Sequence, residues 1–335
     1  MAQPALTSRK PRREWKLSRF KIGPPLFCWR CYYTRFSRTS PVFAPNFANP
    51  QNYVDNRRQL FYYNGTYVLD RTGDKTGGIS VKLFDTHAHY DSGAFNADRR
   101  EVLASMPAKG VELILNPGCD LASSEMAIAL AEAFPFLYAA VGVHPSDCAG
   151  FTEDTWNSLW ALATHPKVKA IGEIGLDYHW KDNPPPEFQQ EVFHRQMDLA
   201  QSAGRPVIVH DREAHHDCLE VVKAHPGVTG VYHCYSGSLE DAKTLVKLGW
   251  MLSFTGVITY KNARKSLEVV DWLPMDQIMI ETDSPYLTPE PFRGKRNDSG
   301  YVCRVAETIA QVKGMDTEEV ARITLENGKQ FFGIL

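Results

Sequence analysis

The stretch Leu83-Phe84-Asp85-Thr86-His87-Ala88-His89 decides how the rest of the chain is interpreted. Its apolar start is typical of a short buried strand, and a His-x-His pair follows directly. Side chains two residues apart in a strand share a face, so His87 and His89 are expected to point the same way. Two neighbouring imidazoles suit one metal ion. Taken alone the motif is weak, and a pair of ordinary surface histidines is the alternative.

Composition and length bound the possible classes of protein. The 335 residues are 43% hydrophobic and 23% charged, as in a globular protein. No apolar run approaches the roughly 18–20 residues that span a bilayer, so no membrane segment is expected. The seven cysteines are scattered and odd in number, which argues against a disulfide framework and predicts a reducing, cytoplasmic location.

The first 80 residues differ from the rest in charge and in pattern. Residues 1–82 contain 15 Lys+Arg and 4 Asp+Glu, whereas the remaining residues contain 22 and 35. Because residues 1–80 show no hydrophobic period, we predict an irregular extension there, disordered or outside the working protein. Residues 81–335 are predicted to form the single functional domain.

Three accounts of this extension are open: a transit peptide, a basic arm (residues 9–38) that binds nucleic acid, or a mis-assigned start. We favour the third as a hypothesis. Gly77-Gly78 can be encoded by GGAGGN, a purine run that recruits bacterial ribosomes, and Val81 can be encoded by GUG, an alternative bacterial start codon.

From residue 81 onward, strand-like and helix-like segments alternate. Apolar runs occur at 81–84, 111–115, 137–143, 168–172, 206–209, 228–232, 250–254 and 277–280. Helices are expected near 97–109, 121–134, 153–164, 186–203, 212–224, 238–248, 261–272, 299–313 and 316–327. Eight β–α units in about 250 residues predict a TIM (β/α)8 barrel. A doubly wound open sheet is the alternative, but no Gly-x-Gly-x-x-Gly follows the first strand.

Most of the predicted strands end in a histidine or a carboxylate. Catalytic residues of such barrels lie at the carboxyl ends of the strands, which meet at one mouth. The residues found there are His87, His89, His144, Glu173, His210, His233 and Asp283. A single buried histidine is usually structural, but six strand ends with such groups predict a metal or catalytic site.

These strand ends carry recognisable motifs. They are Phe-Asp-Thr-His-Ala-His, Gly-Val-His-Pro, Gly-Glu-Ile-Gly-Leu-Asp-Tyr, Val-Ile-Val-His, His-Cys-Tyr-Ser-Gly and Glu-Thr-Asp-Ser-Pro-Tyr-Leu. In this order they resemble the TatD-type deoxyribonuclease family, a branch of the metal-dependent amidohydrolase superfamily. The resemblance covers residues 81–335.

The resemblance implies a site with two divalent metal ions. His87, His89 and Asp283 match the ligands of one ion, His210 and His233 match those of the other, and Glu173 matches the residue that bridges them. Asp283 is also expected to accept a proton from water, so it and Glu173 are the expected catalytic residues. The metal is left open between Mg, Mn and Zn, because carboxylates suit the first two and imidazoles suit Zn.

Further residues are expected to contact the substrate or to support the ligands. His144 matches a family position implicated in binding substrate phosphate or a further metal, and Arg293 begins a stretch similar to the family's Arg-Gly-Lys-Arg-Asn. Arg212 could contact phosphate or form an ion pair at a helix start. Asp85 could orient a ligand imidazole or make a hydrogen bond at the strand end.

By this resemblance, the protein is expected to be a 3′-5′ exonuclease acting on single strands of DNA or RNA, with nucleic acid as its partner. The same site could instead hydrolyse a carboxylic ester, as in D-aminoacyl-tRNA deacylation, because an activated water can attack carbon or phosphorus. A third hypothesis is a nucleic-acid-binding protein that acts through its basic arm.

Overall fold

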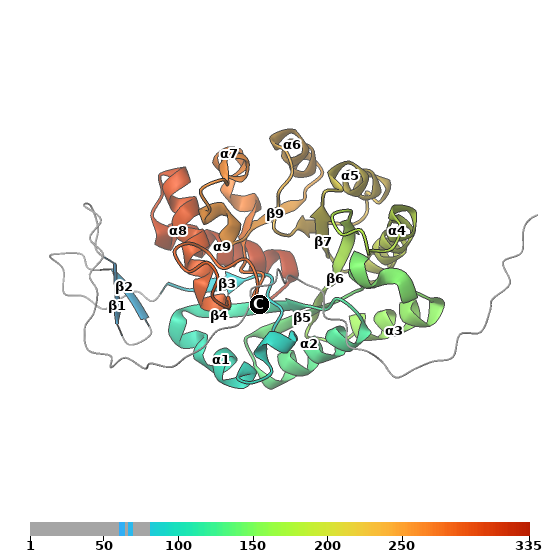
Figure 1. Ribbon diagram of the computed structural model, residues 1–335, viewed down its shortest axis with the longest axis horizontal. Helices are drawn as coiled ribbons and strands as arrows, with labels where there is room; N and C mark the ends of the chain where they lie inside the picture. The colour runs from blue at the N-terminus through green and yellow to red at the C-terminus, as the bar shows by residue number, and fades with distance from the viewer. Residues whose placement is uncertain (1–59, 64–65, 70–80) are drawn as a thin grey trace, which may run out of the picture. The chain divides into compact units, whose positions relative to one another are not determined.

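A computed structural model describes residues 60–63, 66–69 and 81–335 of the chain. Within the last range, eight parallel strands pair in sequence order to form one sheet (Figure 1). They are β3 (Leu83–Asp85), β4 (Val111–Pro117), β5 (Leu137–Val141), β6 (Val168–Asp177), β7 (Val207–Arg212), β8 (Gly230–Tyr232), β9 (Met251–Phe254) and β10 (Ile278–Ile280). Each strand falls on one of the eight predicted apolar runs.

Contacts between β3 and β10 close the sheet on itself. The Thr86 amide donates to the Ile280 carbonyl at 3.2 Å, and Ala88 and Ser284 form a parallel bridge just beyond the two strands. The predicted TIM (β/α)8 barrel is therefore confirmed. Closure also sets the His-x-His segment beside the end of β10, although nearly 200 residues separate the two in the sequence.

Helices lie outside the strands (Figure 1). They are α1 (Arg99–Ser105), α2 (Leu121–Ala133), α3 (Glu153–Ala163), α4 (Pro186–Ala203), α5 (His215–Ala224), α6 (Leu239–Lys247), α7 (Arg264–Trp272), α8 (Val302–Lys313) and α9 (Thr317–Phe332). The predicted helices at 97–109 and 299–313 are divided, because 3-10 turns occupy Pro107–Lys109 and Ser299–Tyr301. α9 runs past its predicted end at 327 and stops at Gly333, whose φ of 58° suits a helix terminus.

Side-chain caps fix the starts of two helices that follow mouth loops. Asp120 accepts a hydrogen bond from the Ser123 amide at 2.7 Å before α2, and Thr152 accepts one from the Thr155 amide at 3.3 Å before α3. Such caps contribute about 0.5–2 kcal/mol each relative to alanine. They therefore anchor the loops after β4 and β5, which border the candidate site.

The inside of the barrel is packed with apolar side chains up to its lower end. Strand residues that share this inner cluster are Phe84, Leu113, Leu115, Ala140, Ala170, Ile208, Val231, Met251 and Met279. α9 adds Leu325 and Phe332, and the ring of Phe332 lies 6.0 Å from that of Phe84. Apolar packing thus fills the end where the strands begin, and the polar groups gather where the strands end.

Part of the N-terminal extension is also described. Leu60–Tyr63 (β1) and Thr66–Leu69 (β2) pair as an antiparallel hairpin, with Tyr63 opposite Thr66. The prediction of irregular structure is therefore wrong for these residues. The sequence carried a signal for it, because aromatic and β-branched runs flank Asn64-Gly65, the pair favoured in two-residue hairpin loops. The basic arm and the proposed start region at 77–80 lie outside the described residues.

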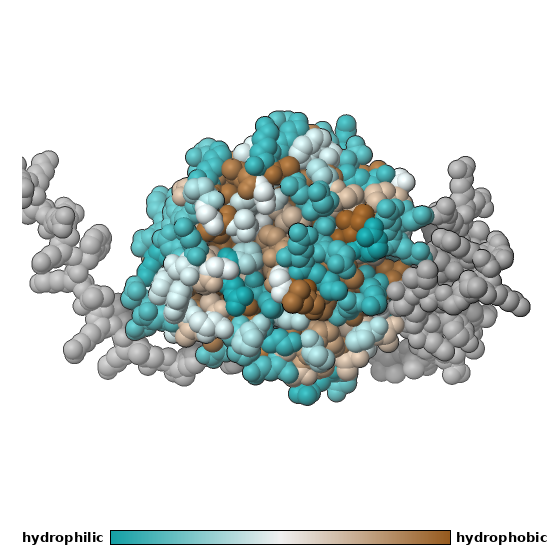
Figure 2. Space-filling model, turned by 180° about the vertical axis from the view of Figure 1, so that it is seen from behind, coloured by the Kyte–Doolittle hydropathy of each residue, from teal (hydrophilic) through white to brown (hydrophobic). Residues whose placement is uncertain are grey.

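The face drawn in Figure 2 is mainly hydrophilic, with separate hydrophobic patches. Among the described residues, the exposed large hydrophobic side chains are Met126, Trp160, Trp180, Leu248, Trp272 and Leu335. In the described part of the chain, no helix combines the length and the apolar character needed to cross a bilayer.

Candidate metal centre

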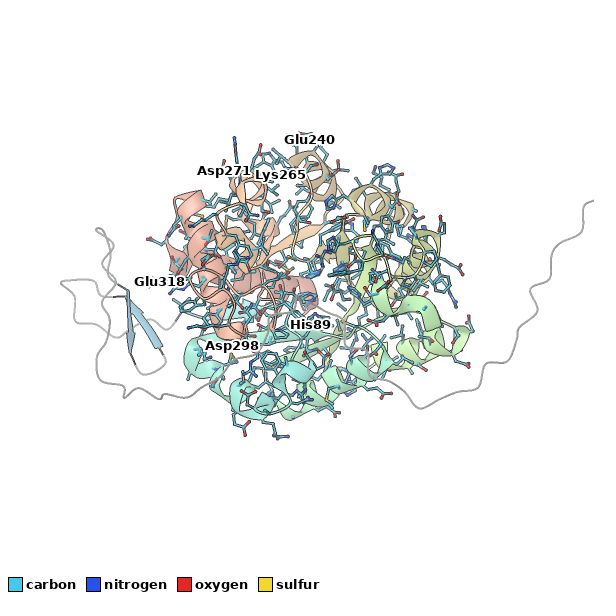
Figure 3. The ribbon with its side chains drawn as sticks, viewed as in Figure 1. His89, Glu240, Lys265, Asp271, Asp298 and Glu318 are labelled. Carbon is cyan, nitrogen blue, oxygen red and sulfur yellow. The ribbon has the colours of Figure 1, made fainter. Side chains whose placement is uncertain are left out.

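The six side chains expected to bind metal lie at the ends of five strands. His87 and His89 follow β3, Glu173 lies in β6, His210 lies in β7, His233 follows β8 and Asp283 follows β10. All six are buried or half-buried. Figure 3 shows His89 in the middle of the barrel, whereas Glu240, Lys265 and Asp271 lie on the outer helices. The barrel therefore gathers the predicted residues in one place.

The local backbone explains two of these positions. The Asp283 amide donates to the His87 carbonyl at 2.8 Å, which ties the end of β10 to the His-x-His segment. Asp283 itself has a φ of 57°, a left-handed conformation that aspartate tolerates better than most residues. At Gly175 an added Cβ would meet the His210 carbonyl oxygen, so only glycine lets β6 approach β7 this closely.

The first half of the centre contains His87, His89 and Asp283. The Nε2 atoms of His87 and His89 are 3.0 Å apart, which confirms that the two imidazoles converge. Each Nε2 also faces a Glu173 oxygen, Oε2, at 3.3 and 3.4 Å. Asp283 Oδ1 lies 3.8 Å from the first Nε2 and 3.6 Å from the second.

The second half contains His210 and His233, and it faces the other Glu173 oxygen. His210 Nδ1 lies 2.7 Å and His233 Nε2 lies 2.9 Å from Glu173 Oε1, and these two nitrogens are 3.2 Å apart. His144 Nε2 lies 3.7 Å from the same oxygen. The two oxygens of one carboxylate are thus divided between two sets of imidazoles.

The donor atoms fit divalent metal ions. Two nitrogens that are each about 2.0–2.1 Å from one ion lie roughly 2.9–3.4 Å apart, which matches both nitrogen pairs of the centre. His87 Nδ1 has no hydrogen-bond partner although it is buried, so this ring is not held in place by a hydrogen bond on its outer side. One group that could hold an ion is His87, His89 and Asp283, and another is His144, Glu173 and His210.

The charges of the centre follow from its packing. Burial alone would raise the pKa of Glu173, but the imidazoles of His233 and His87 hold it well below its ordinary value. Burial, assisted by the neighbouring His210, lowers the pKa of His144 to about 3. Because His144 Nδ1 accepts a hydrogen bond from the Ser146 amide at 3.1 Å, the proton of the neutral ring is assigned to Nε2. His144 is therefore placed as a hydrogen-bond donor.

Three carboxylates contact the outer nitrogens of the histidines, and the sequence analysis gave none of them a role. Asp177 Oδ2 lies 3.3 Å from His210 Nε2, and Glu281 Oε1 lies 3.3 Å from His233 Nδ1. Asp91 Oδ1 lies 3.8 Å from His89 Nδ1, near Cys119 Sγ at 3.9 Å from the same nitrogen. A carboxylate on the outer nitrogen fixes the tautomer so that the other nitrogen presents its lone pair to the centre.

The sequence held a partial signal for this arrangement. Asp177 and Glu281 stand inside motifs that were singled out, each close to a predicted ligand. Nothing in sequence spacing, however, indicates which histidine each carboxylate meets, because each pair joins two different strands.

Asp85 does not orient a ligand imidazole. Its Oδ1 accepts a hydrogen bond from the Thr282 amide at 2.8 Å, and its Oδ2 accepts one from the Thr282 hydroxyl at 2.6 Å. Burial raises the pKa of Asp85 to about 7. Of the two roles considered for this residue, the strand-end hydrogen bond is the one observed, and it links the ends of β3 and β10.

The two arginines expected to contact substrate each stack on an aromatic ring. Arg212, the last residue of β7, places its Cζ 5.2 Å from the centroid of the Trp180 ring. Arg293 follows β10 and places its Cζ 4.2 Å from the Tyr260 ring, with 58% of its side chain exposed. His144 therefore contacts the centre directly, whereas both arginines are described by contacts outside it.

A parallel barrel whose strand ends gather four imidazoles and two carboxylates defines a metal-dependent hydrolase of the amidohydrolase fold. The particular family follows from comparison with known proteins. Residues 84–333 match the family described as TatD related DNase, and the chain belongs to this family.

Known relatives agree with this assignment. The chain is 45% identical over 254 residues to the uncharacterized metal-dependent hydrolase YabD of Bacillus subtilis, a match that covers 75% of this chain and 99% of that protein. It is 32% identical over 261 residues to the 3′-5′ ssDNA/RNA exonuclease TatD of Citrobacter rodentium, covering 75% and 98%. The crystal structure of YjjV, a TatD homologue from Escherichia coli, has a TM-score of 0.73 and 31% identity, covering 77% of this chain and all of that one.

Proposed function

We propose that the protein hydrolyses phosphodiester bonds in single-stranded DNA or RNA and removes nucleotides from the 3′ end. The observation that carries the proposal is the division of the Glu173 carboxylate between two sets of imidazoles. That arrangement suits two ions close together, which is the pattern of enzymes that cleave phosphodiesters. Two relatives with the printed name 3′-5′ ssDNA/RNA exonuclease TatD support the choice of substrate.

In this proposal the six central side chains hold two divalent ions: His87, His89 and Asp283 one, His210 and His233 the other, and Glu173 both. Ions held there lower the pKa of a bound water and stabilise charge on the phosphate oxygens. The donor set suits Mg, Mn or Zn, because it combines carboxylates with imidazoles.

The remaining residues of the proposal act on protons and on the substrate. Asp283 accepts the proton that the attacking water loses, since its Oδ1 faces the first pair of imidazoles. His144 donates a hydrogen bond from Nε2 to a phosphate oxygen, because its tautomer places the proton there. Arg212 and Arg293 bind phosphates farther along the strand.

The experiment uses single-stranded oligonucleotides labelled at either end, with Mg, Mn or Zn added separately to metal-stripped protein. A 5′ label should yield a ladder of progressively shorter products, because nucleotides leave from the 3′ end. The same preparations are assayed on a D-aminoacyl ester. Ester hydrolysis without any oligonucleotide cleavage under all three metals would overturn the proposal in favour of the deacylase alternative.

Nucleic acid is the only partner in this proposal, and the cytoplasm is the proposed location, on the basis of the scattered cysteines. The alternative in which the basic arm binds nucleic acid concerns residues 9–38, which lie outside the described residues. No contact in the described part of the chain favours that alternative.

A further inference from the structure

Trp180 and Arg212 lie at the ends of two neighbouring strands that also carry the metal centre. β6 ends at Asp177 and β7 ends at Arg212, and the Tyr178 amide donates to the Arg212 carbonyl at 3.0 Å. Trp180 comes three residues after Asp177, whose carboxylate contacts His210. Three residues span at most about 11 Å, so the indole lies close to the mouth of the barrel.

Neighbouring side chains hold the indole while part of it stays exposed. His179 Nδ1 lies 2.7 Å from Glu213 Oε1, and the His179 ring stands nearly perpendicular to the Trp180 ring, with centroids 4.7 Å apart. The Arg212 guanidinium lies 5.2 Å from the indole centroid. The Trp180 residue is nevertheless 40% exposed. A large aromatic side chain that is already immobilised loses little conformational entropy when a ligand binds.

We infer that Trp180 and Arg212 form a nucleotide-binding subsite beside the metal centre, an inference that rests on the nucleic-acid function proposed above. The indole stacks on one base, and the planar guanidinium donates hydrogen bonds to the adjoining phosphate. Beyond residue 82 the chain carries 35 Asp+Glu and 22 Lys+Arg, so its overall charge repels nucleic acid. Affinity for the strand must then come from local contacts of this kind.

The subsite selects for single strands. A base within a duplex is stacked on both faces, so it cannot stack on an indole unless it is first flipped out. A base in a single strand exposes its faces at much lower cost, and aromatic stacking accepts every base. Trp180 therefore favours unpaired substrate without reading its sequence.

The test compares Trp180→Ala with Trp180→Phe and with Trp272→Ala. Trp272 is 38% exposed and is the last residue of α7, so it ends a helix far from the strand ends and serves as a matched control. Stacking of one base on an aromatic ring corresponds to a factor of roughly 5–100 in affinity. Trp180→Ala should raise Kd for a single-stranded oligonucleotide by such a factor, whereas Trp180→Phe should retain most of the affinity and Trp272→Ala all of it.

A second oligonucleotide, abasic at its 3′-terminal positions, separates stacking from any general effect of the substitution. On this substrate the parent and Trp180→Ala should bind equally, because there is no base to stack. Arg212→Ala should weaken binding to both oligonucleotides, and its effect should shrink as salt is raised. An equal loss on both oligonucleotides for Trp180→Ala would overturn the stacking role.

Binding is measured by fluorescence anisotropy in EDTA, so that it does not depend on cleavage. If the parent binds through Trp180 but cleaves no oligonucleotide with any metal, the subsite stands and the proposed nuclease function fails. If the parent cleaves oligonucleotides and Trp180→Ala matches it in Kd and KM, the nuclease function stands and the subsite is wrong. If the parent neither binds nor cleaves, both are wrong.

Discussion

Asp177 and Glu173 contact opposite nitrogens of the same imidazole, that of His210. Asp177 Oδ2 lies 3.3 Å from Nε2, and Glu173 Oε1 lies 2.7 Å from Nδ1. The proton is therefore expected on Nε2, and the Nδ1 lone pair faces the centre. Glu281 stands in the same relation to His233, so two histidines of the second half are oriented alike.

The first prediction is that Asp177→Asn weakens metal binding roughly 10–100-fold. Asparagine keeps an oxygen for the His179 amide, which donates to Asp177 Oδ1 at 2.9 Å, so the loop should survive. Its NH2 group, however, would donate to His210 Nε2 and move the ring proton to Nδ1, facing Glu173. Chelator competition measures the affinity, with the exposed Asp182→Asn in the same loop as the control. Equal affinities for the two variants would show that the Asp177 carboxylate does not orient His210.

The second prediction concerns Asp283→Asn. The variant should melt near the parent temperature, because asparagine also tolerates the left-handed backbone at this position, where φ is 57°. It should lose at least about 10²-fold in kcat, since an amide cannot accept the proton of the attacking water. Thermal melting and single-turnover kinetics give the two readouts. Turnover close to that of the parent would mean that Asp283 is structural.

The third prediction is that EDTA abolishes hydrolysis and that a divalent cation restores it. Glu173 and the four central imidazoles supply the donors, and hydrolysis by this family depends on metal. Metal analysis before and after chelation must accompany the assay, and titration of Mg, Mn and Zn identifies the ion. Full activity in protein verified to be free of metal would contradict the mechanism.

The fourth prediction is that residues 81–335 fold and remain active on their own. All eight barrel strands, and every side chain of the candidate centre, lie in this segment. Removing residues 1–80 deletes the β1–β2 hairpin and the basic arm but no strand of the barrel. Circular dichroism and the oligonucleotide assay compare the truncated and full-length proteins. An insoluble or inactive fragment would favour a functional role for the arm.

The sequence by itself determined the barrel and most of the centre. Eight apolar runs at β–α spacing specify eight strands, and parallel strands joined by helices bring their carboxyl ends together. The side chains that follow those runs must then meet at one mouth. Period-2 alternation also explains why His87 and His89 converge, since residues two apart in a strand share a face.

Only the tertiary structure decided how the groups pair across strands. Sequence spacing fixes neighbours within one strand, but the pairing of Asp177 with His210, and of Asp85 with Thr282, depends on the register between strands and on barrel closure. That register shifts between β5 and β6 and between β6 and β7, so it cannot be counted from residue numbers. The placement of Trp180 beside Arg212 has the same origin, because the loop after β6 is held by hydrogen bonds to the end of β7.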